Sequence, residues 1–349
     1  MKSPNASRAA GPTQIEPKRI GIESNKFTTY NALDCRFLPI LCLKNTSECD
    51  RLGPEDETHT IAHNKQRHKM TTEHALRSVA PEALASTRAI AHRAVQHLTR
   101  AARANLDAAP DDSHSNLGWD KERQAFISHS MNDCTVGLTL APLTLFVSKG
   151  NTEVGHLALA GKSDADATAW IDERLGEVGL KPASSVSLPY ELPSDVAAVE
   201  AYAENSADDN QFSALAAWFH VASESLNTFA DANSTIEPGP SPVRCWPHHF
   251  DIATYVALET GDPETARGIG VGMSPGDTGY NEPYLYINPW PYLDADNLPE
   301  AVKPGHWHKE GYVGLIATAT ELTTCDTVSD AIPDFITGAF SSARKARGF

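Results

Sequence analysis

The sequence predicts an α+β fold in which antiparallel strands and hairpins are backed by amphipathic helices, with a C-terminal helix. Apolar residues recur at helical spacing in several long segments and alternate at strand spacing in others. Turn residues join the alternating segments into hairpins. Helices and hairpins are unevenly interspersed, which favours α+β over the regular strand and helix alternation of a doubly wound sheet.

The first helix is predicted to run from Pro81 to about Leu106. Proline suits the first turn of a helix, because its missing N–H would have no partner there. The charged residues Arg88 and Arg103 lie off the apolar stripe of this helix. The stripe itself follows helical steps: Leu84, Ala91, Val95, Leu98, Ala102 and Leu106.

A hairpin is predicted next. The segment LTLAPLTLFV, residues 138–147, alternates but changes phase at Pro142. Because proline cannot donate to a strand ladder, this predicts one strand that is broken or bulged at a sheet edge. Residues 148–152 form a turn, and residues 154–159 are expected to return as the second arm.

Three further helices follow, and two of them carry start signals. Ser163 with Asp166, and Ser206 with Asp209, have the spacing of N-terminal capping pairs. The C-terminal helix is predicted from about Ile332. It ends in cations that suit the negative end of the helix dipole: Arg344, Lys345 and Arg347.

Domain boundaries follow from composition. Residues 1–69 lack periodicity and mix polar, charged and proline residues, which predicts a disordered N-terminal extension. We expect Met70 to be the native start. Residues 70–349 are predicted to form a single α+β domain, with a subdivision near the linker at residues 233–242.

Charge and hydropathy narrow the function classes. The net charge of −16 disfavours nucleic-acid binding, because an acidic body repels phosphate backbones. No apolar run approaches the roughly 20 residues that span a bilayer, so we expect no membrane association and a cytoplasmic location. The six cysteines form no CxxC pair, which is typical of reduced structural thiols. The oligomeric state stays open.

The segment GIGVGMSPGDTGYNEPYLYINPWPY, residues 268–292, predicts a strand, a Pro-Gly turn and a second strand. Gly268, Gly270 and Gly272 would share one face of the first strand. Glycine weakens a strand, so this face is expected to lie close to something bulky. That partner is either an aromatic ring of the protein, from Trp246 or a tyrosine, or a bound ligand.

Our leading functional hypothesis is a small-molecule-binding domain with an aromatic and acidic cleft. Acidic groups beside aromatic faces suit a sugar or a cationic ligand. The alternative for the carboxylates is turn capping, above all by Asp277. The predicted walls and polar anchors are Trp246, Tyr284 and Tyr286, and Asp251, Asp277 and Glu282.

A second hypothesis is a metal-dependent, hydrolase-like enzyme. Side chains two residues apart on an extended segment share a face, so His249 with Asp251, and His306 with His308, could each present two ligands. Such a set suits zinc or iron, with Glu310 as a base. The alternative is that these histidines are polar strand ends and a solvated turn.

A third hypothesis is a protein-interaction module whose aromatic residues form a contact patch.

The motif around the Pro-Gly turn resembles bacterial proteins catalogued only as a domain of unknown function. The segment from Gly268 to Tyr286 is similar to that family's glycine strand, Pro-Gly turn, Glu and aromatic strand. The stretch from Ser241 to Ala253 is similar to its Ser-Pro-Val to Phe-Asp stretch. The resemblance implies no activity. It favours Asp251, Asp277 and Glu282 over a metal site, because the family lacks histidines at positions 248 and 249.

Overall fold

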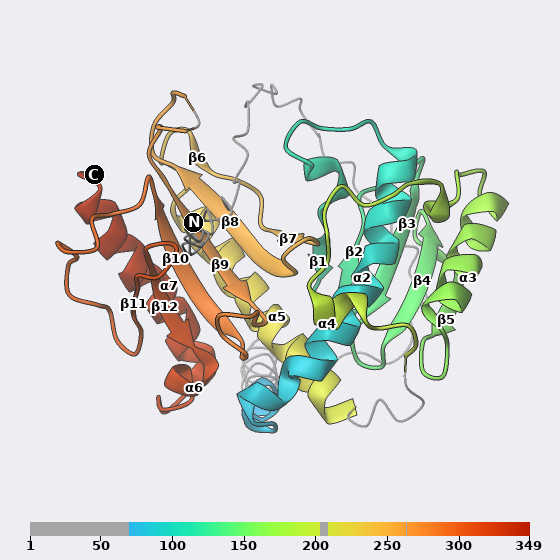
Figure 1. Ribbon diagram of the computed structural model, residues 1–349, viewed down its shortest axis with the longest axis horizontal. Coiled ribbons are helices and arrows are strands. Elements are labelled where there is room, and N and C mark those ends of the chain that lie inside the picture. The colour runs from blue at the N-terminus through green and yellow to red at the C-terminus, as the bar shows by residue number, and fades with distance from the viewer. Residues whose placement is uncertain (1–69, 203–208, 263) are drawn as a thin grey trace, which may run out of the picture.

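The computed structural model describes residues 70–202, 209–262 and 264–349. Two predictions lie outside this range, namely the disordered extension of residues 1–69 and the cap at Ser206. The predicted native start, Met70, is the first described residue. The α+β class is confirmed: helices surround two antiparallel sheets, and the chain closes with a C-terminal helix (Figure 1).

The first sheet is a five-stranded antiparallel meander in sequence order. Its strands are β1 (Gly118–Asp120), β2 (Ala125–Ile127), β3 (Cys134–Thr139), β4 (Thr144–Lys149) and β5 (Thr152–Ala158). The hairpin of β4 and β5 agrees with the sequence. The prediction of one strand interrupted at Pro142 is wrong, because Thr139 of β3 pairs with Thr144 of β4 across a tight turn. The change of phase at Pro142 therefore marks the end of one strand and the start of the next.

The second sheet has seven strands, in the order β11-β12-β10-β9-β8-β6, with β7 also paired to β8. The strands are β6 (Gly239–Pro240), β7 (Arg244–Trp246), β8 (Asp251–Ala257), β9 (Gly268–Ser274), β10 (Tyr284–Trp290), β11 (His306–His308) and β12 (Gly314–Thr318). The hairpin predicted from the glycine and tyrosine segment is formed by β9 and β10.

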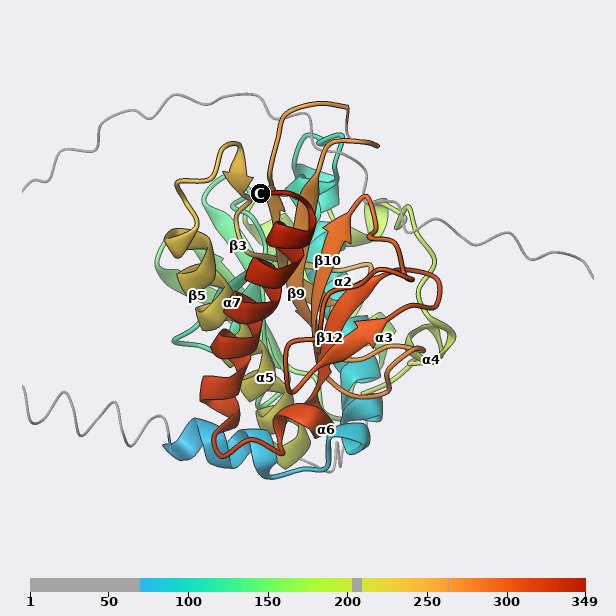
Figure 2. The same ribbon diagram turned by 90° about the vertical axis from the view of Figure 1, so that its left-hand side faces the viewer.

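Two long helices cover one face of the seven-stranded sheet. They are α5 (Asp209–Ala232) and α7 (Val328–Ala346), which contact β8, β9 and β10. Figure 2 shows α7 lying across the sheet. Ile269, Val271 and Met273 of β9 are fully buried beneath them. The opposite face of this sheet, called the outer face below, carries the glycines of β9 and the tyrosines of β10.

The remaining helices include α2 (Ala85–Asn105), α3 (Asp164–Glu177), α4 (Ser194–Ala197) and α6 (Ala319–Leu322). Helix α2 runs through the middle of the molecule, in contact with β3, α3 and α5 (Figure 1). The predicted Ser163 and Asp166 capping pair is present at α3. Within the described residues, no helix has both the length and the apolar character needed to cross a bilayer.

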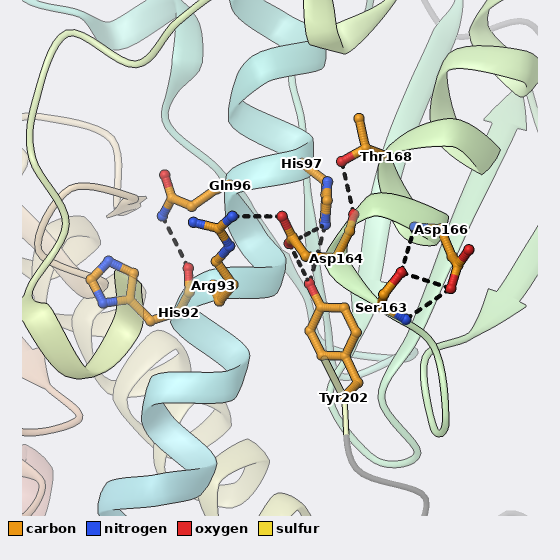
Figure 3. A network of polar contacts seen from close by, with 9 residues as sticks. All are labelled: His92, Arg93, Gln96, His97, Ser163, Asp164, Asp166, Thr168 and Tyr202. Carbon is orange, nitrogen blue, oxygen red and sulfur yellow. Dashed lines mark hydrogen bonds and ion pairs between the residues drawn. The ribbon is translucent and has the colours of Figure 1, made fainter. Parts of the chain in front are cut away.

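A buried polar network holds α2 against α3 (Figure 3). The Asp164 carboxylate accepts hydrogen bonds from Arg93 Nη2 at 2.6 Å and from the Tyr202 hydroxyl at 3.0 Å, and it lies 3.1 Å from His97 Nε2. Burial alone would raise the pKa of Asp164, but the bonds from His97 and Arg93 lower it well below its usual range. These contacts of Asp164 join residues between positions 93 and 202.

The two sheets share one core. Phe126 of β2, Phe219 of α5 and Phe250, just before β8, form a ring cluster with centroids 4.8 to 5.4 Å apart. The backbones of Leu117 and Cys245 also exchange two hydrogen bonds of 2.9 Å, so β7 touches the first sheet as well as the second. The subdivision near residues 233–242 stays a prediction.

Candidate ligand-binding site

The glycine face of β9 is filled by tyrosines of neighbouring strands. A Cβ atom added to Gly272 would lie 2.5 Å from Cζ and Oη of Tyr286, and one added to Gly268 would collide with the ring of Tyr255. At Gly270 the nearest atoms would be 3.8 Å away. Two of the three glycines therefore make room for aromatic rings, as predicted, and those rings are tyrosines of the chain.

The ring of Tyr286 crosses β9 and reaches the start of β8. Its hydroxyl donates a very short hydrogen bond to Oδ2 of Asp251. A second pair lies on the same outer face, where the Tyr284 hydroxyl donates to Oδ2 of Asp277 at 2.7 Å. Burial, together with the paired carboxylate, raises the pKa of both phenols. The structure thus brings four of the six predicted ligand residues together, as two tyrosine and aspartate pairs.

Asp251 differs from Asp277 in what its second oxygen contacts. Oδ1 of Asp251 is buried and has no hydrogen-bond partner among the described residues. Burial raises the pKa of this carboxyl, although the nearby charge of His249 and the bond from Tyr286 oppose that shift. Most buried polar atoms in proteins find a partner, so an unpaired carboxylate oxygen marks a position of interest.

Trp246 lies beside Asp251. The two residues are cross-strand partners of β7 and β8, so their side chains share a face. His249 is exposed and stands two residues before Asp251. Its ring lies 4.2 Å from the ring of His248, and burial lowers the pKa of His248 to about 4. The Trp246, His249, Asp251 and Tyr286 side chains form what we call the Asp251 site.

Helix α2 supplies a polar face that the sequence analysis missed. His92 Nε2 and Gln96 Nε2 both lie 2.8 Å from the carbonyl oxygen of Pro247, and the His92 ring stacks on Phe250 at 5.1 Å. Burial lowers the pKa of His92 to about 4. Residues 88, 92 and 96 are spaced by four, so they share one helix face. That spacing of polar residues within a long apolar helix was the available signal.

Arg88 lies on the same face of α2 and reaches the turn between β9 and β10. Its Nη2 is 3.4 Å from Oδ1 of Asn281 and 3.5 Å from Oδ2 of Asp195. Its Nη1 is buried without a partner among the described residues, beside the space that a Cβ on Gly276 would take. Gly276 has a φ of +111°, which also favours glycine.

Asp277 and Glu282 have structural partners. Oδ1 of Asp277 accepts from the backbone amides of Gly279 at 2.7 Å and Tyr280 at 3.0 Å, so it caps its turn. Oε2 of Glu282 accepts from the amide of Thr320 at 2.7 Å, in the first turn of α6. The alternative reading of these carboxylates as local caps therefore accounts for their contacts.

The three histidines predicted as metal ligands do not meet. His249 adjoins β8, whereas His306 and His308 belong to β11, four strand spacings or about 19 Å away across the sheet. The strand order that separates them is not visible in local sequence. Among the described residues, no group of three histidine, cysteine or acidic side chains has an arrangement that could hold a metal ion.

His306 and His308 instead form a chain of hydrogen bonds around Tyr280. The Tyr280 hydroxyl lies 3.1 Å from His306 Nε2 and 2.9 Å from His308 Nδ1. On their far sides, His306 Nδ1 contacts Oε1 of Glu321 at 2.8 Å, and His308 Nε2 contacts the Glu310 carbonyl oxygen at 2.6 Å.

Exposed aromatic residues are too few for the predicted contact patch. Of the aromatic residues in the described parts of 240–312, only Tyr292 ranks among the exposed large hydrophobic side chains, and 37% of its surface is accessible. The others lie in different parts of the chain, namely Met70, Val154 and Phe349.

Comparisons with known proteins give no relative from which a role could be transferred. No family model, no curated protein and no solved structure matches this chain significantly. The function is therefore argued from the Asp251 site and its neighbours alone.

Proposed function

We propose that this protein binds a small molecule at the Asp251 site, and that the ligand carries N–H or O–H donors on a body that can lie against aromatic rings. The observation that carries this proposal is the unpaired oxygen Oδ1 of Asp251. A buried acceptor without a partner costs about 1–3 kcal/mol, and such costs are typical of binding and catalytic positions.

The surroundings of Asp251 suit an amine or a polyol. A carboxylate accepts hydrogen bonds from ammonium and hydroxyl groups. Trp246 and Tyr286 add aromatic faces, which favour cationic groups and the apolar faces of sugars. His249 is exposed two residues before Asp251 and adds a polar group near the carboxylate.

The test is a screen of small amines and polyols by 1H–15N NMR. Compounds that bind should shift the Trp246 indole signal and the amides of residues 249–251. Asp251→Asn should abolish these shifts, because the amide replaces an acceptor oxygen and removes the charge. Asp277→Asn is the matched control, since that carboxylate also binds a tyrosine but has no unpaired oxygen. Equal affinity in wild type and Asp251→Asn would refute the proposal.

A second candidate function is proton transfer at Tyr280. The Glu321 carboxylate and the Glu310 carbonyl only accept hydrogen bonds, so the imidazole nitrogens that face them carry protons. The other two nitrogens, Nε2 of His306 and Nδ1 of His308, both face the Tyr280 hydroxyl, which has one proton and can donate it to only one of them. Both bonds to Tyr280 can form only if His306 or His308 carries a second proton, which would give a store for acid–base chemistry.

The proton count is tested by 15N NMR of the imidazole side chains near pH 7. One doubly protonated ring among His306 and His308 is expected, and Tyr280→Phe should return it to the singly protonated form. Two singly protonated rings in the wild type would remove the basis for this second candidate.

A further inference from the structure

A hollow of about 170 Å³ lies where the two sheets meet, and it shares no residue with the Asp251 site. Strand β1, the end of β2 and strand β7 contribute its lining. The lining residues are Gly118, Trp119, Asp120, Ile127, Ser128, His129 and Arg244. The hollow is built from segments that are more than a hundred residues apart in sequence.

Arg244 is the unusual member of this lining. It is half-buried, and its guanidinium forms no ion pair or hydrogen bond with another described residue. Burial alone accounts for the lowered pKa of Arg244. By contrast, Arg93, Arg103 and Arg267 each contact a carboxylate at 2.6 to 2.7 Å. A partly desolvated cation without a counter-charge is costly, which is a reason to expect a ligand that supplies the charge.

The local backbone leaves room for the guanidinium. A Cβ added to Gly118 would lie 3.0 Å from Arg244 Nη1, so any larger residue would press on this group. Trp119, the next residue, lines the hollow, and its buried Nε1 has no partner within the described chain. The indole itself packs in the core, where its ring centroid lies 4.9 Å from that of Phe126 and 5.9 Å from that of Phe219.

The other charged groups of the hollow do not neutralise Arg244. Oδ1 of Asp120 accepts from the amides of Glu122 and Arg123, both at 3.0 Å, and so serves its own turn. His129 Nε2 lies 2.8 Å from Oδ1 of Asn116. Burial and the charge of Arg244 lower the pKa of His129, which disfavours a positive charge on its ring. No carboxylate shifts the pKa of Arg244, so its guanidinium has no close counter-charge among the described residues.

We propose that the Arg244 hollow binds a single oxyanion, either a carboxylate or a phosphate group. A guanidinium presents two parallel N–H donors that match two oxygens of such an anion. This inference does not depend on ligand binding at the Asp251 site.

The test uses the full-length chain with inorganic phosphate and with acetate, each titrated by calorimetry at constant ionic strength. Saturable binding of at least one anion is expected. Arg244→Gln should weaken it roughly tenfold or more, because a charge-assisted pair of hydrogen bonds is lost. Arg123→Gln is the matched control, since Arg123 is a nearby exposed cation that pairs with Glu153 and lines no hollow.

Two further variants keep the test decisive if Arg244→Gln does not fold by circular dichroism. Arg244→Lys keeps the charge without the planar fork, and Gly118→Ala crowds the guanidinium; each should weaken binding. Tighter binding of phosphate would identify a phosphorylated ligand, and tighter binding of acetate a carboxylate. No saturable response to either anion, or equal losses in Arg123→Gln and Arg244→Gln, would overturn the proposal.

Discussion

Asp164 and Asp251 are both withdrawn from water, yet their surroundings are opposite. Asp164 is held by an arginine, a histidine and a tyrosine, and its pKa is lowered. Within the described parts of the chain, Asp251 has one phenol as a side-chain donor and an oxygen without a partner, and its pKa is raised. Burial alone therefore does not reveal the role of an acid. The donors around it separate a carboxylate that stabilises the fold from one that is available to a ligand.

The largest effect is expected from Asp164→Ala. This substitution leaves the buried His97 and the partly buried Arg93 without their carboxylate, which should lower the free energy of unfolding by about 3–5 kcal/mol. Urea unfolding measures the loss. Asp166→Ala in the same helix cap is the control, because that residue is exposed and a lost cap costs about 1 kcal/mol. Equal losses of stability in Asp164→Ala and Asp166→Ala would show that Asp164 does not stabilise the fold more than an exposed cap residue.

Acid unfolding tests the same contrast. The folded pKa of Asp164 is lowered, so its stabilisation is fully present above the unfolded pKa of about 4 and is lost as pH falls towards the folded pKa. Stability measured from pH 6 to 2 should therefore fall less steeply in Asp164→Asn than in the wild type. An unchanged slope would show that Asp164 is not the linked group.

Gly272→Ala should have the next largest effect. The added methyl group would displace the Tyr286 ring and remove the one side-chain donor that Asp251 has among the described residues. A loss of about 1–3 kcal/mol is expected in urea unfolding, as for other overpacked sites. Gly270→Ala is the matched control on the same strand face, because its nearest atoms would be 3.8 Å away. A similar loss in both variants would point to backbone effects instead.

Glu282→Ala should cost about 1 kcal/mol, because Glu282 accepts one backbone hydrogen bond at the start of α6. It should leave ligand binding at the Asp251 site unchanged. Thermal unfolding and the NMR screen measure the two quantities. Loss of ligand binding without loss of stability would show that Glu282 takes part in ligand binding. An acid with a hydrogen-bond partner in the fold could then bind the ligand as well.

Asp251→Asn should have the smallest effect on stability, within about 1 kcal/mol at pH 7, because the amide can still accept from Tyr286. The sign of its pH dependence is opposite to that of Asp164. A raised folded pKa makes the wild type less stable as pH rises from about 4 through that pKa. Urea unfolding at several pH values should show that Asp251→Asn lacks this loss. A large loss at pH 7 would make Asp251 a structural acid.

Much of the fold follows from local pattern. The capping pair of Ser163 and Asp166, the β9 and β10 hairpin and the C-terminal helix could all be predicted, because each depends on residues a few positions apart. The phase change at Pro142 predicts a broken strand, but the structure has two strands joined by a turn. Alternation alone does not distinguish these two arrangements.

The site was less accessible to sequence reasoning, because it depends on strand order and cross-strand contact. The tyrosine and aspartate pairs use residues that the sequence had singled out, but their pairing arises only when Tyr286 crosses Gly272. His306 could not be placed relative to His249 without the sheet order. The sequence places Arg88 off the apolar stripe of its helix, but it does not show that Arg88 reaches the turn after β9.

The backbone bonds between Leu117 and Cys245 have a consequence for synthesis of the chain. The segment leading into β1 lacks this partner until residue 245 has left the ribosome, so the first sheet emerges well before its neighbour. The ring of Phe126 can contact Phe219 and Phe250 only after those residues have also emerged. We expect the nascent first half to expose apolar surface and to become protected from proteases only after β7 and β8 have emerged.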